Sequence, residues 1–218
     1  MNKQFPILAI ETTSDLCSVA VQFNENDFIE LNYLAKHIHS EKLMSMIAQV
    51  VEESKIDISN FSCVAVSIGP GSFTGLRIGL SSAKGIAFGA SLPIIPVPTF
   101  DALALQVKNF LPPSIEFSIL FSASIEDYYF SKYKIDDDHL IKIDEISLIS
   151  FSKISEKLKK DDLIFGNAKF DELNVKKIYT QARSISNWAY LFGKDLLTFN
   201  YDNLEPLYVK QFIGKVKP

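Results

Sequence analysis

The sequence predicts an α/β fold in two lobes of related topology, each holding a mixed sheet flanked by helices. Apolar residues make up 47% of the 218 residues and charged ones 22%, which is the range of a folded globular protein. Short apolar strands alternate with helical segments along the chain, as they do in α/β proteins. A linker-like stretch at Leu111–Ser114 divides the chain, so we expect lobes at residues 1–110 and 111–218.

The first half predicts antiparallel strands followed by alternating helices and strands. The apolar run Phe5–Ser14 ends in Thr-Thr-Ser, which is typical of a buried strand that leads into a polar turn. The connection after it is short, so we expect a hairpin with the next strand. The other elements expected are strands at Cys17–Phe23, Phe28–Ala35 and Phe61–Gly69, an extended segment at Leu92–Phe100, and helices beginning at Ser40 and Ser72 and spanning Phe100–Val107.

Ser40 is expected to cap the first helix, with Glu41 in the first turn, where the helix dipole favours an anion. The apolar stripe of this helix is wide enough to cover a sheet and still leave apolar residues at its edge for contact with a partner. It consists of Leu43, Ile47 and Val50, with Met44, Ala48 and Val51 beside them.

The second half follows a similar order of elements, without a repeat at the level of residues. Asp127–Ile135 is rich in aromatic residues and is strongly β-prone. A turn is expected at Asp136–His139. The other elements expected are strands at Ile115–Ala123, Leu140–Ser150 and Leu163–Gly166, and helices at Ser152–Asp162 and Ile185–Leu197, the last of which can pack back on the first lobe.

Composition limits the partners and the compartment. The net charge is −4 and the isoelectric point about 5.4, so the chain as a whole lacks the basic character of a strong nucleic-acid binder. Cys17 and Cys63 have no C-x-x-C spacing, which favours reduced core thiols over a disulfide. The first apolar run is too short for a signal peptide, and no segment approaches the roughly 20 apolar residues of a membrane span. We expect a soluble, cytoplasmic protein that does not contact a membrane.

Six of the nine glycines lie between Ser67 and Ala90, in the segment that is also the best helix candidate. Glycine costs about 1 kcal/mol relative to alanine in a helix interior, so this crowding needs a reason. A phosphate-binding turn is one reason, but the spacing misses both the dinucleotide fingerprint and the Walker A loop. A helix N-terminus can still bind an anion without a named motif. The candidate contacts for an anion or nucleotide are Thr12, Thr13, Ser14, Gly69 and Gly71.

Close packing is the other reason, and the spacing favours it. Small residues recur every four positions, at Gly71, Gly75, Gly79, Ala83 and Ala87. A helix that begins near Ser72 aligns them in one bare stripe, which lets another backbone approach as small residues do between membrane helices. Three interior glycines cost about 3 kcal/mol, which contact with a sheet or with a second helix would offset.

Arg77 and Lys84 lie seven residues apart on one face of the same helix, with Ser81 between them. This pattern fits an ordinary solvated face, and it also fits the charged rim of a partner site. The sequence leaves both interpretations open.

The chain is short of catalytic and metal-binding motifs. His37 and His39 form an H-x-H pair without a carboxylate or thiol at ligand spacing, and H-E-x-x-H is absent. The acidic run Asp136–Asp138 lacks the glycine and the distal glutamate of a calcium loop. There is no G-x-S-x-G, and the neighbours Glu126 and Asp127 face opposite ways on a strand. We expect no catalytic residue, no metal and no cofactor.

Three stretches together closely resemble the TsaB (YeaZ) family: Ile7–Val21, His39–Val51 and Ser67–Ala104. The likeness runs without a break from about residue 5 to 107, and GPGSFTGLRIG (Gly69–Gly79) is its most specific part. The second half matches more loosely, at Glu126, Tyr128, Pro206 and Tyr208.

This resemblance implies an actin/Hsp70-like (ASKHA) fold with lobes of ribonuclease H-like topology. It implies a role in forming N6-threonylcarbamoyladenosine at position 37 of tRNAs that read ANN codons. The implied role is that of a non-catalytic paralogue of TsaD that binds TsaD through two first-lobe helices. The family also implies contact with a TsaE-type ATPase through that complex, and a homodimer through the same surface when TsaD is absent. Contact with tRNA would be indirect or weak.

The expected partner interface combines the two helices of the first lobe. It consists of Leu43, Met46, Ile47, Val50, Ser72, Phe73, Gly75, Arg77, Gly79, Ala83 and Lys84. On this interpretation Gly75→Leu leaves the fold largely formed but abolishes the complex.

Some residues depart from the family pattern. Ser122 and Ser124 stand where family members often have Asp and Arg, and Glu11 stands where Asp is commoner. Thr12–Ser14 follow Glu11 without the glycine-rich turn of actin-like ATPases, so a complete ATP site in this chain alone is not expected.

Two functions therefore compete. The first is a partner-binding scaffold, and the second is an actin-fold ATPase or phosphotransferase with its own nucleotide between the lobes. A basic tail, with Lys210, Lys215 and Lys217, is either solvated or in contact with tRNA.

Overall fold

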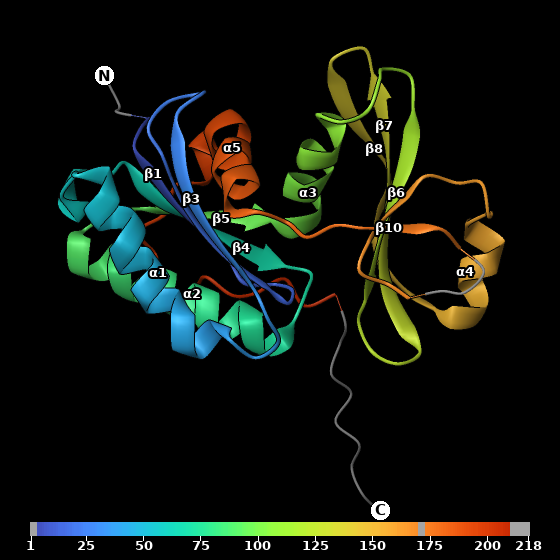
Figure 1. The fold of residues 1–218 in the computed structure, drawn as a ribbon, viewed down its shortest axis with the longest axis horizontal. Helices are drawn as coiled ribbons and strands as arrows, with labels where there is room; N and C mark the ends of the chain where they lie inside the picture. Colours follow the sequence, from blue (N-terminus) through green and yellow to red (C-terminus); the bar gives the residue numbers. More distant parts are fainter. Residues whose placement is uncertain (1–3, 170–172, 210–218) are drawn as a thin grey trace, which may run out of the picture.

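The computed structural model describes residues 4–169 and 173–209, which form five layers (Figure 1). Helices α1 (His39–Ser54) and α2 (Phe73–Ala90) cover the outer face of a first sheet, and α3 (Thr99–Lys108) and α5 (Ala182–Phe192) cover its inner face. Helix α3 also packs on a second sheet, whose far side is covered by α4 (Phe151–Lys157). Within the described residues, no helix is both long and apolar enough to cross a membrane.

The first sheet has the order β3-β2-β1-β4-β5 and is mixed, because β1 pairs antiparallel with β2 and parallel with β4. Both of its faces are covered, which explains the continuous apolar run at its centre: Leu8 and Ile10 face α1 and α2, while Ile7 and Ala9 face α5. The strands are β1 (Ile7–Glu11), β2 (Leu16–Gln22), β3 (Phe28–Leu34), β4 (Cys63–Gly69) and β5 (Ile94–Pro98).

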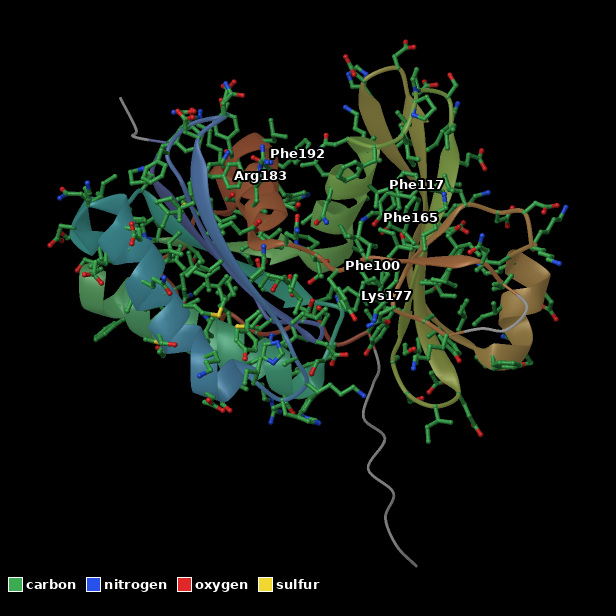
Figure 2. The ribbon with its side chains drawn as sticks, in the orientation of Figure 1. Phe100, Phe117, Phe165, Lys177, Arg183 and Phe192 are labelled. Atoms are coloured by element: carbon green, nitrogen blue, oxygen red, sulfur yellow. The ribbon has the colours of Figure 1, made fainter. Side chains whose placement is uncertain are left out.

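The second sheet has the order β10-β9-β6-β7-β8. Its core against α3 is aromatic, and Figure 2 shows Phe100 of α3 beside Phe117 and Phe165 of the sheet. The rings of Phe117 and Phe165 meet edge to face at 6.0 Å between centroids. The strands are β6 (Glu116–Ser122), β7 (Asp127–Asp136), β8 (His139–Ser150), β9 (Ile164–Gly166) and β10 (Val175–Lys177).

Helix α5 follows the second sheet in the chain but packs on the first. Its N-terminal amides are capped by side chains of other elements: Ser18 Oγ accepts from Ala182 N at 2.8 Å, and Glu30 Oε1 accepts from Arg183 N at 2.8 Å. A carboxylate at this position also suits the helix dipole. The first lobe therefore includes a helix from the end of the chain, while the division near residue 110 stays a prediction.

Most expected elements are present, and the differences lie at their ends. Helix α1 begins at His39, and its N-cap Ile38 makes no side-chain hydrogen bond, so the prediction of a Ser40 cap is wrong. The Ser72 cap of α2 is confirmed, because its hydroxyl accepts from Gly75 N at 3.2 Å. The helix expected over Ile185–Leu197 ends at Phe192 and a 3₁₀ turn follows. The short strand β10 was not predicted.

Candidate functional site

The turn between β1 and β2 holds the N-terminus of α2. Thr12 Oγ1 donates to the carbonyl oxygen of Gly75 at 2.8 Å, and Ser72 N donates to the carbonyl oxygen of Thr13 at 2.7 Å. Both bonds join segments far apart in the sequence. The loop from β4 into α2 therefore has one fixed position against the end of β1.

The glycines that recur every four positions in and just before α2 allow this contact. A Cβ at Gly75 would lie 2.0 Å from the carbonyl oxygen of Thr12, and one at Gly79 would lie 2.2 Å from Thr12 Oγ1. A Cβ at Gly71 would lie 2.5 Å from Thr13 Cβ. Close packing is thus the reason for these glycines, and the backbone that approaches them belongs to the same chain.

This geometry corrects part of the predicted interface. Gly75, Gly79 and Ala83 are buried against the β1–β2 turn and the first sheet, so they present no surface to a partner. The geometry also argues against a largely formed fold in Gly75→Leu, because a side chain there meets the backbone of Thr12. The apolar residues predicted on α1 are also at most 7% exposed, because they fill the core under α1: Leu43, Met46, Ile47 and Val50.

The exposed side of α2 is a different set of residues. Gly85 and Gly89 lie in open space, since a Cβ on either would meet no described atom within 4 Å outside the local helix backbone. Phe88 beside them is 75% exposed. We define the outer face of α2 by six of its exposed residues: Phe73, Arg77, Ser81, Gly85, Phe88 and Gly89. Of the predicted interface, Ser72, Phe73 and Arg77 are exposed and Lys84 is half-buried.

A cluster of three side chains lies at the N-terminal end of this face. The Arg77 guanidinium carbon lies 3.8 Å from the centre of the Phe73 ring, and Arg77 Nε donates to the hydroxyl of Tyr208 at 3.3 Å. The rings of Phe73 and Tyr208 are 5.4 Å apart. Sequence reasoning gave Tyr208 no role, because 131 residues separate it from Arg77 and no local pattern signals the contact.

Tyr208 belongs to a segment, residues 198–209, that runs along the first lobe and that we call the C-terminal strap. The strap begins with a backbone pair between Thr198 and Ile94 at the edge of β5. The Tyr201 hydroxyl then donates to the carbonyl oxygen of Leu92 at 2.7 Å, and Leu207 N donates to that of Ile68 at 2.7 Å. The strap therefore follows α2 back to its N-terminus.

A cavity of about 610 Å³ lies between the lobes, at the β1–β2 turn, the N-terminus of α2 and the β6–β7 turn. None of the described residues that line it is lysine or arginine, and its basic side chains are those of His37 and His39. Its polar lining is mostly hydroxyl groups, contributed by Thr13, Ser14, Ser40, Ser72, Thr74, Ser122 and Ser124.

The structure divides the candidate anion contacts into two groups. Thr13, Ser14 and Gly71 line the cavity, as a ligand site there would require. Thr12 and Gly69 do not, and their assignment is wrong. Thr12 is fully buried under α2 with its hydroxyl bonded to Gly75, and Gly69 N donates to Thr99 Oγ1 at 3.1 Å.

Glu11 lies below this cavity and is fully buried. Its Oε1 accepts hydrogen bonds from the amide and the hydroxyl of Thr13, while Oε2 has no partner among the described residues. Burial raises the pKa of Glu11 to about 7, because desolvation of the carboxylate outweighs the hydrogen bonds from Thr13. The carboxyl group thus gains and loses its proton near neutral pH, out of reach of solvent.

The remaining polar candidates form no reactive cluster. His37 is exposed, and His39 is buried with Nε2 3.3 Å from the carbonyl oxygen of Leu16. Burial raises the thiol pKa of Cys17 to about 11 and that of Cys63 to about 12, so neither forms a thiolate near neutral pH. In residues 4–169 and 173–209, no three His, Cys, Asp or Glu side chains are grouped to hold a metal ion. Lys210, Lys215 and Lys217 lie outside the described residues.

Comparison with known proteins places the chain among tRNA-modification proteins. A family model described as TsaD, tRNA N6-adenosine threonylcarbamoyltransferase, matches residues 33–192. The TsaB protein of Haemophilus influenzae, described as a tRNA threonylcarbamoyladenosine biosynthesis protein, is 33% identical over 126 residues. That alignment covers 58% of this chain and about half (52%) of the relative. TsaB of Buchnera aphidicola subsp. Schizaphis graminum is 33% identical to this chain. That alignment covers 71% of this chain and 73% of the Buchnera protein.

Solved structures have the same fold. A solved structure of YeaZ from Pseudomonas aeruginosa superposes with a TM-score of 0.77, at 18% identity. The match covers 93% of this chain and 99% of the YeaZ chain. A second Pseudomonas aeruginosa structure, of a protein described as similar to peptidase YEAZ, matches with the same TM-score over 94% of this chain. The α/β fold expected from the sequence is confirmed.

Proposed function

Because the chain belongs to the TsaB (YeaZ) family, whose members share homology with TsaD, we propose that it is a non-catalytic subunit of N6-threonylcarbamoyladenosine formation at position 37 of ANN-decoding tRNAs. In this role it binds and supports a TsaD-type paralogue. The paralogue docks on the outer face of α2.

One observation supports this docking site above all. Gly85, inside α2, costs about 1 kcal/mol relative to alanine, and Gly89 lies in the last turn of the helix. No contact of either glycine to the described residues offsets this cost. Phe88 lies exposed between them. A partner helix could approach the bare backbone at the two glycines and cover the Phe88 ring, which burial in an interface would stabilise.

The cavity between the lobes supports a non-catalytic role. Its described lining offers hydroxyl groups and no lysine or arginine, whereas phosphoryl transfer requires neutralisation of the developing negative charge. Glu11, at the end of β1, is covered by Thr13 and other buried groups. The second function considered, an ATPase with its own nucleotide, is therefore less well supported.

Further partners follow from the same proposal. A second copy of the chain occupies the outer face of α2 when the paralogue is absent, giving a homodimer. A TsaE-type ATPase meets the chain through the complex, tRNA is contacted only indirectly or weakly, and the complex works in the cytoplasm.

Depletion of the protein from its own cells tests this function. We expect the content of N6-threonylcarbamoyladenosine in tRNA nucleosides to fall, and wild type and Gly85→Ala to restore it. Gly85→Leu should restore it poorly, because the leucine occupies the space of the partner backbone. Unchanged nucleoside content after depletion would overturn the proposed role.

A further inference from the structure

We propose that Tyr208 and Phe73 hold Arg77 ready to bind a carboxylate of the subunit that docks on the outer face of α2. This inference rests on the proposed function and adds to it the chemistry of the docking partner. It also gives the C-terminal strap a part in recognition.

The Arg77 side chain is held in place at one edge and is free at the other. Its guanidinium lies over the Phe73 ring at 3.8 Å, and Nε is used by the Tyr208 hydroxyl. The two terminal nitrogens make no hydrogen bond or ion pair to any residue in the described part of the chain. Arg77 is exposed, and α2 contains no Asp or Glu. The paired donors of this charged, planar group are therefore unused by any residue in 4–169 and 173–209.

The planar guanidinium group of Arg77 is suited to bind a carboxylate. Guanidinium groups bind carboxylates through two parallel N–H···O bonds, which are stronger than hydrogen bonds between neutral groups. Lys84 lies two turns along the same helix and also has no ion pair among the described residues. The planar guanidinium of Arg77 fits a single Asp or Glu side chain of the partner.

Acidic groups of the chain itself do not satisfy this requirement. Asp202 and Glu205 of the strap line a groove of about 320 Å³ together with Arg77 and Lys84. No ion pair within 4.0 Å joins these carboxylates to the two cations in the described structure. The strap thus leaves the paired donors of Arg77 open while it supplies the Tyr208 hydroxyl.

Arg77 is preorganised for binding by its contacts with Phe73 and Tyr208. A free arginine loses much rotamer freedom on binding, whereas Arg77 is already held by a ring on one side and a hydroxyl at Nε. Tyr208 is itself fixed, because Leu207 N donates to the carbonyl oxygen of Ile68 at 2.7 Å. Tyr208 is therefore a positioning residue for recognition: it contacts Arg77 and acts through it.

Affinity measurements with the purified TsaD-type paralogue test the inference. Arg77→Lys keeps the charge and loses the planar guanidinium, and we expect it to weaken binding about tenfold or more. Tyr208→Phe keeps the ring and loses the hydroxyl, and we expect a loss of about threefold. Tyr190→Phe is the matched control. The hydroxyl of Tyr190, on α5, contacts Glu25 in the β2–β3 turn, so its removal should leave the affinity unchanged.

A double-mutant cycle separates positioning from a general structural effect. If Tyr208 acts through Arg77, Tyr208→Phe should have no further effect in the Arg77→Lys background. Additive losses would overturn the positioning role. Wild-type affinity of both single variants would overturn the inference and leave the proposed function standing. Failure of the wild-type chain to bind the paralogue at all would overturn both.

Discussion

Thr12 and Gly75 contact each other through their backbones as well as through the Thr12 hydroxyl. Thr12 Oγ1 donates to the carbonyl oxygen of Gly75 at 2.8 Å, across 63 residues of sequence. The carbonyl oxygen of Thr12 occupies the space that a Cβ at Gly75 would need, at 2.0 Å. This contact determines which side of α2 faces the first sheet and which side is left for a partner.

Alanine substitutions at Gly75 and Gly85 should change stability in opposite directions. Gly75→Ala forces a methyl group against the Thr12 backbone, and we expect it to lower the free energy of unfolding by about 1–3 kcal/mol. Gly85→Ala adds a methyl group in open space and improves helix propensity, so it should raise that free energy by about 1 kcal/mol. Urea unfolding of the two variants and of wild type measures both changes in the free energy of unfolding.

Equal effects of the two alanines would contradict this account. In particular, a Gly75→Ala variant as stable as wild type would mean that α2 does not approach the β1–β2 turn as described.

Glu11 should make stability fall as the pH rises between about 4.5 and 7. Its pKa is 4.5 in the unfolded chain and about 7 in the fold, so the folded state keeps a proton that the unfolded state has lost. The stability it gives is complete below pH 4.5 and is lost as the pH rises through 7, in total about 3 kcal/mol. The free energy of unfolding is measured from pH 4.5 to 8 for wild type and Glu11→Gln.

The comparison with Glu11→Gln isolates this one group, since the other titrating residues are shared. We expect the difference between wild type and variant to shift by about 3 kcal/mol in favour of the variant as the pH rises. A difference that is constant with pH would show that Glu11 has an ordinary pKa.

The first lobe should not fold from residues 1–110 alone. The inner face of its sheet, including Ile7 and Ala9, is covered by Ala182, Ile185 and Ala189 of α5. A chain that ends at residue 110 exposes this face, and the side chains that cap α5 lose their partners. We expect circular dichroism to show no cooperative thermal unfolding for this fragment, in contrast to the full chain. A cooperative transition near that of the full chain would establish residues 1–110 as an independent domain.

The isolated chain should bind ATP and magnesium weakly. The cavity offers Thr13, Ser14 and other hydroxyl groups, but no described lysine or arginine to balance the phosphate charge. Isothermal titration calorimetry with and without magnesium measures this directly, and we expect no binding at micromolar concentrations. Tight, magnesium-dependent binding would restore the ATPase or phosphotransferase as the better function.

Much of the fold could be predicted because its signals are local. Apolar runs, turns and the Ser72 cap lie within a few residues of the elements they define, and the four-residue spacing of glycines correctly indicated close packing. The short strand β10 has no such signal, because only three residues pair with β9.

The site could be predicted only in part, because sequence spacing places residues on a helix face without saying what that face contacts. The spacing predicts that Gly75 and Gly79 contact a partner, but in the structure they contact Thr12, and it is Gly85 and Gly89 that lie in open space. The Phe73, Arg77 and Tyr208 cluster depends on where the C-terminal strap ends, which is a property of the whole fold.

The most direct test of the docking site is the affinity of Gly85→Leu for the purified TsaD-type paralogue, measured beside Gly85→Ala and wild type. The site is open in the free chain, so both variants should fold with near wild-type or higher stability. If the paralogue docks on the outer face of α2, leucine should weaken binding at least tenfold, while alanine has a much smaller effect. Wild-type affinity of a folded Gly85→Leu chain would contradict the account and place the partner elsewhere.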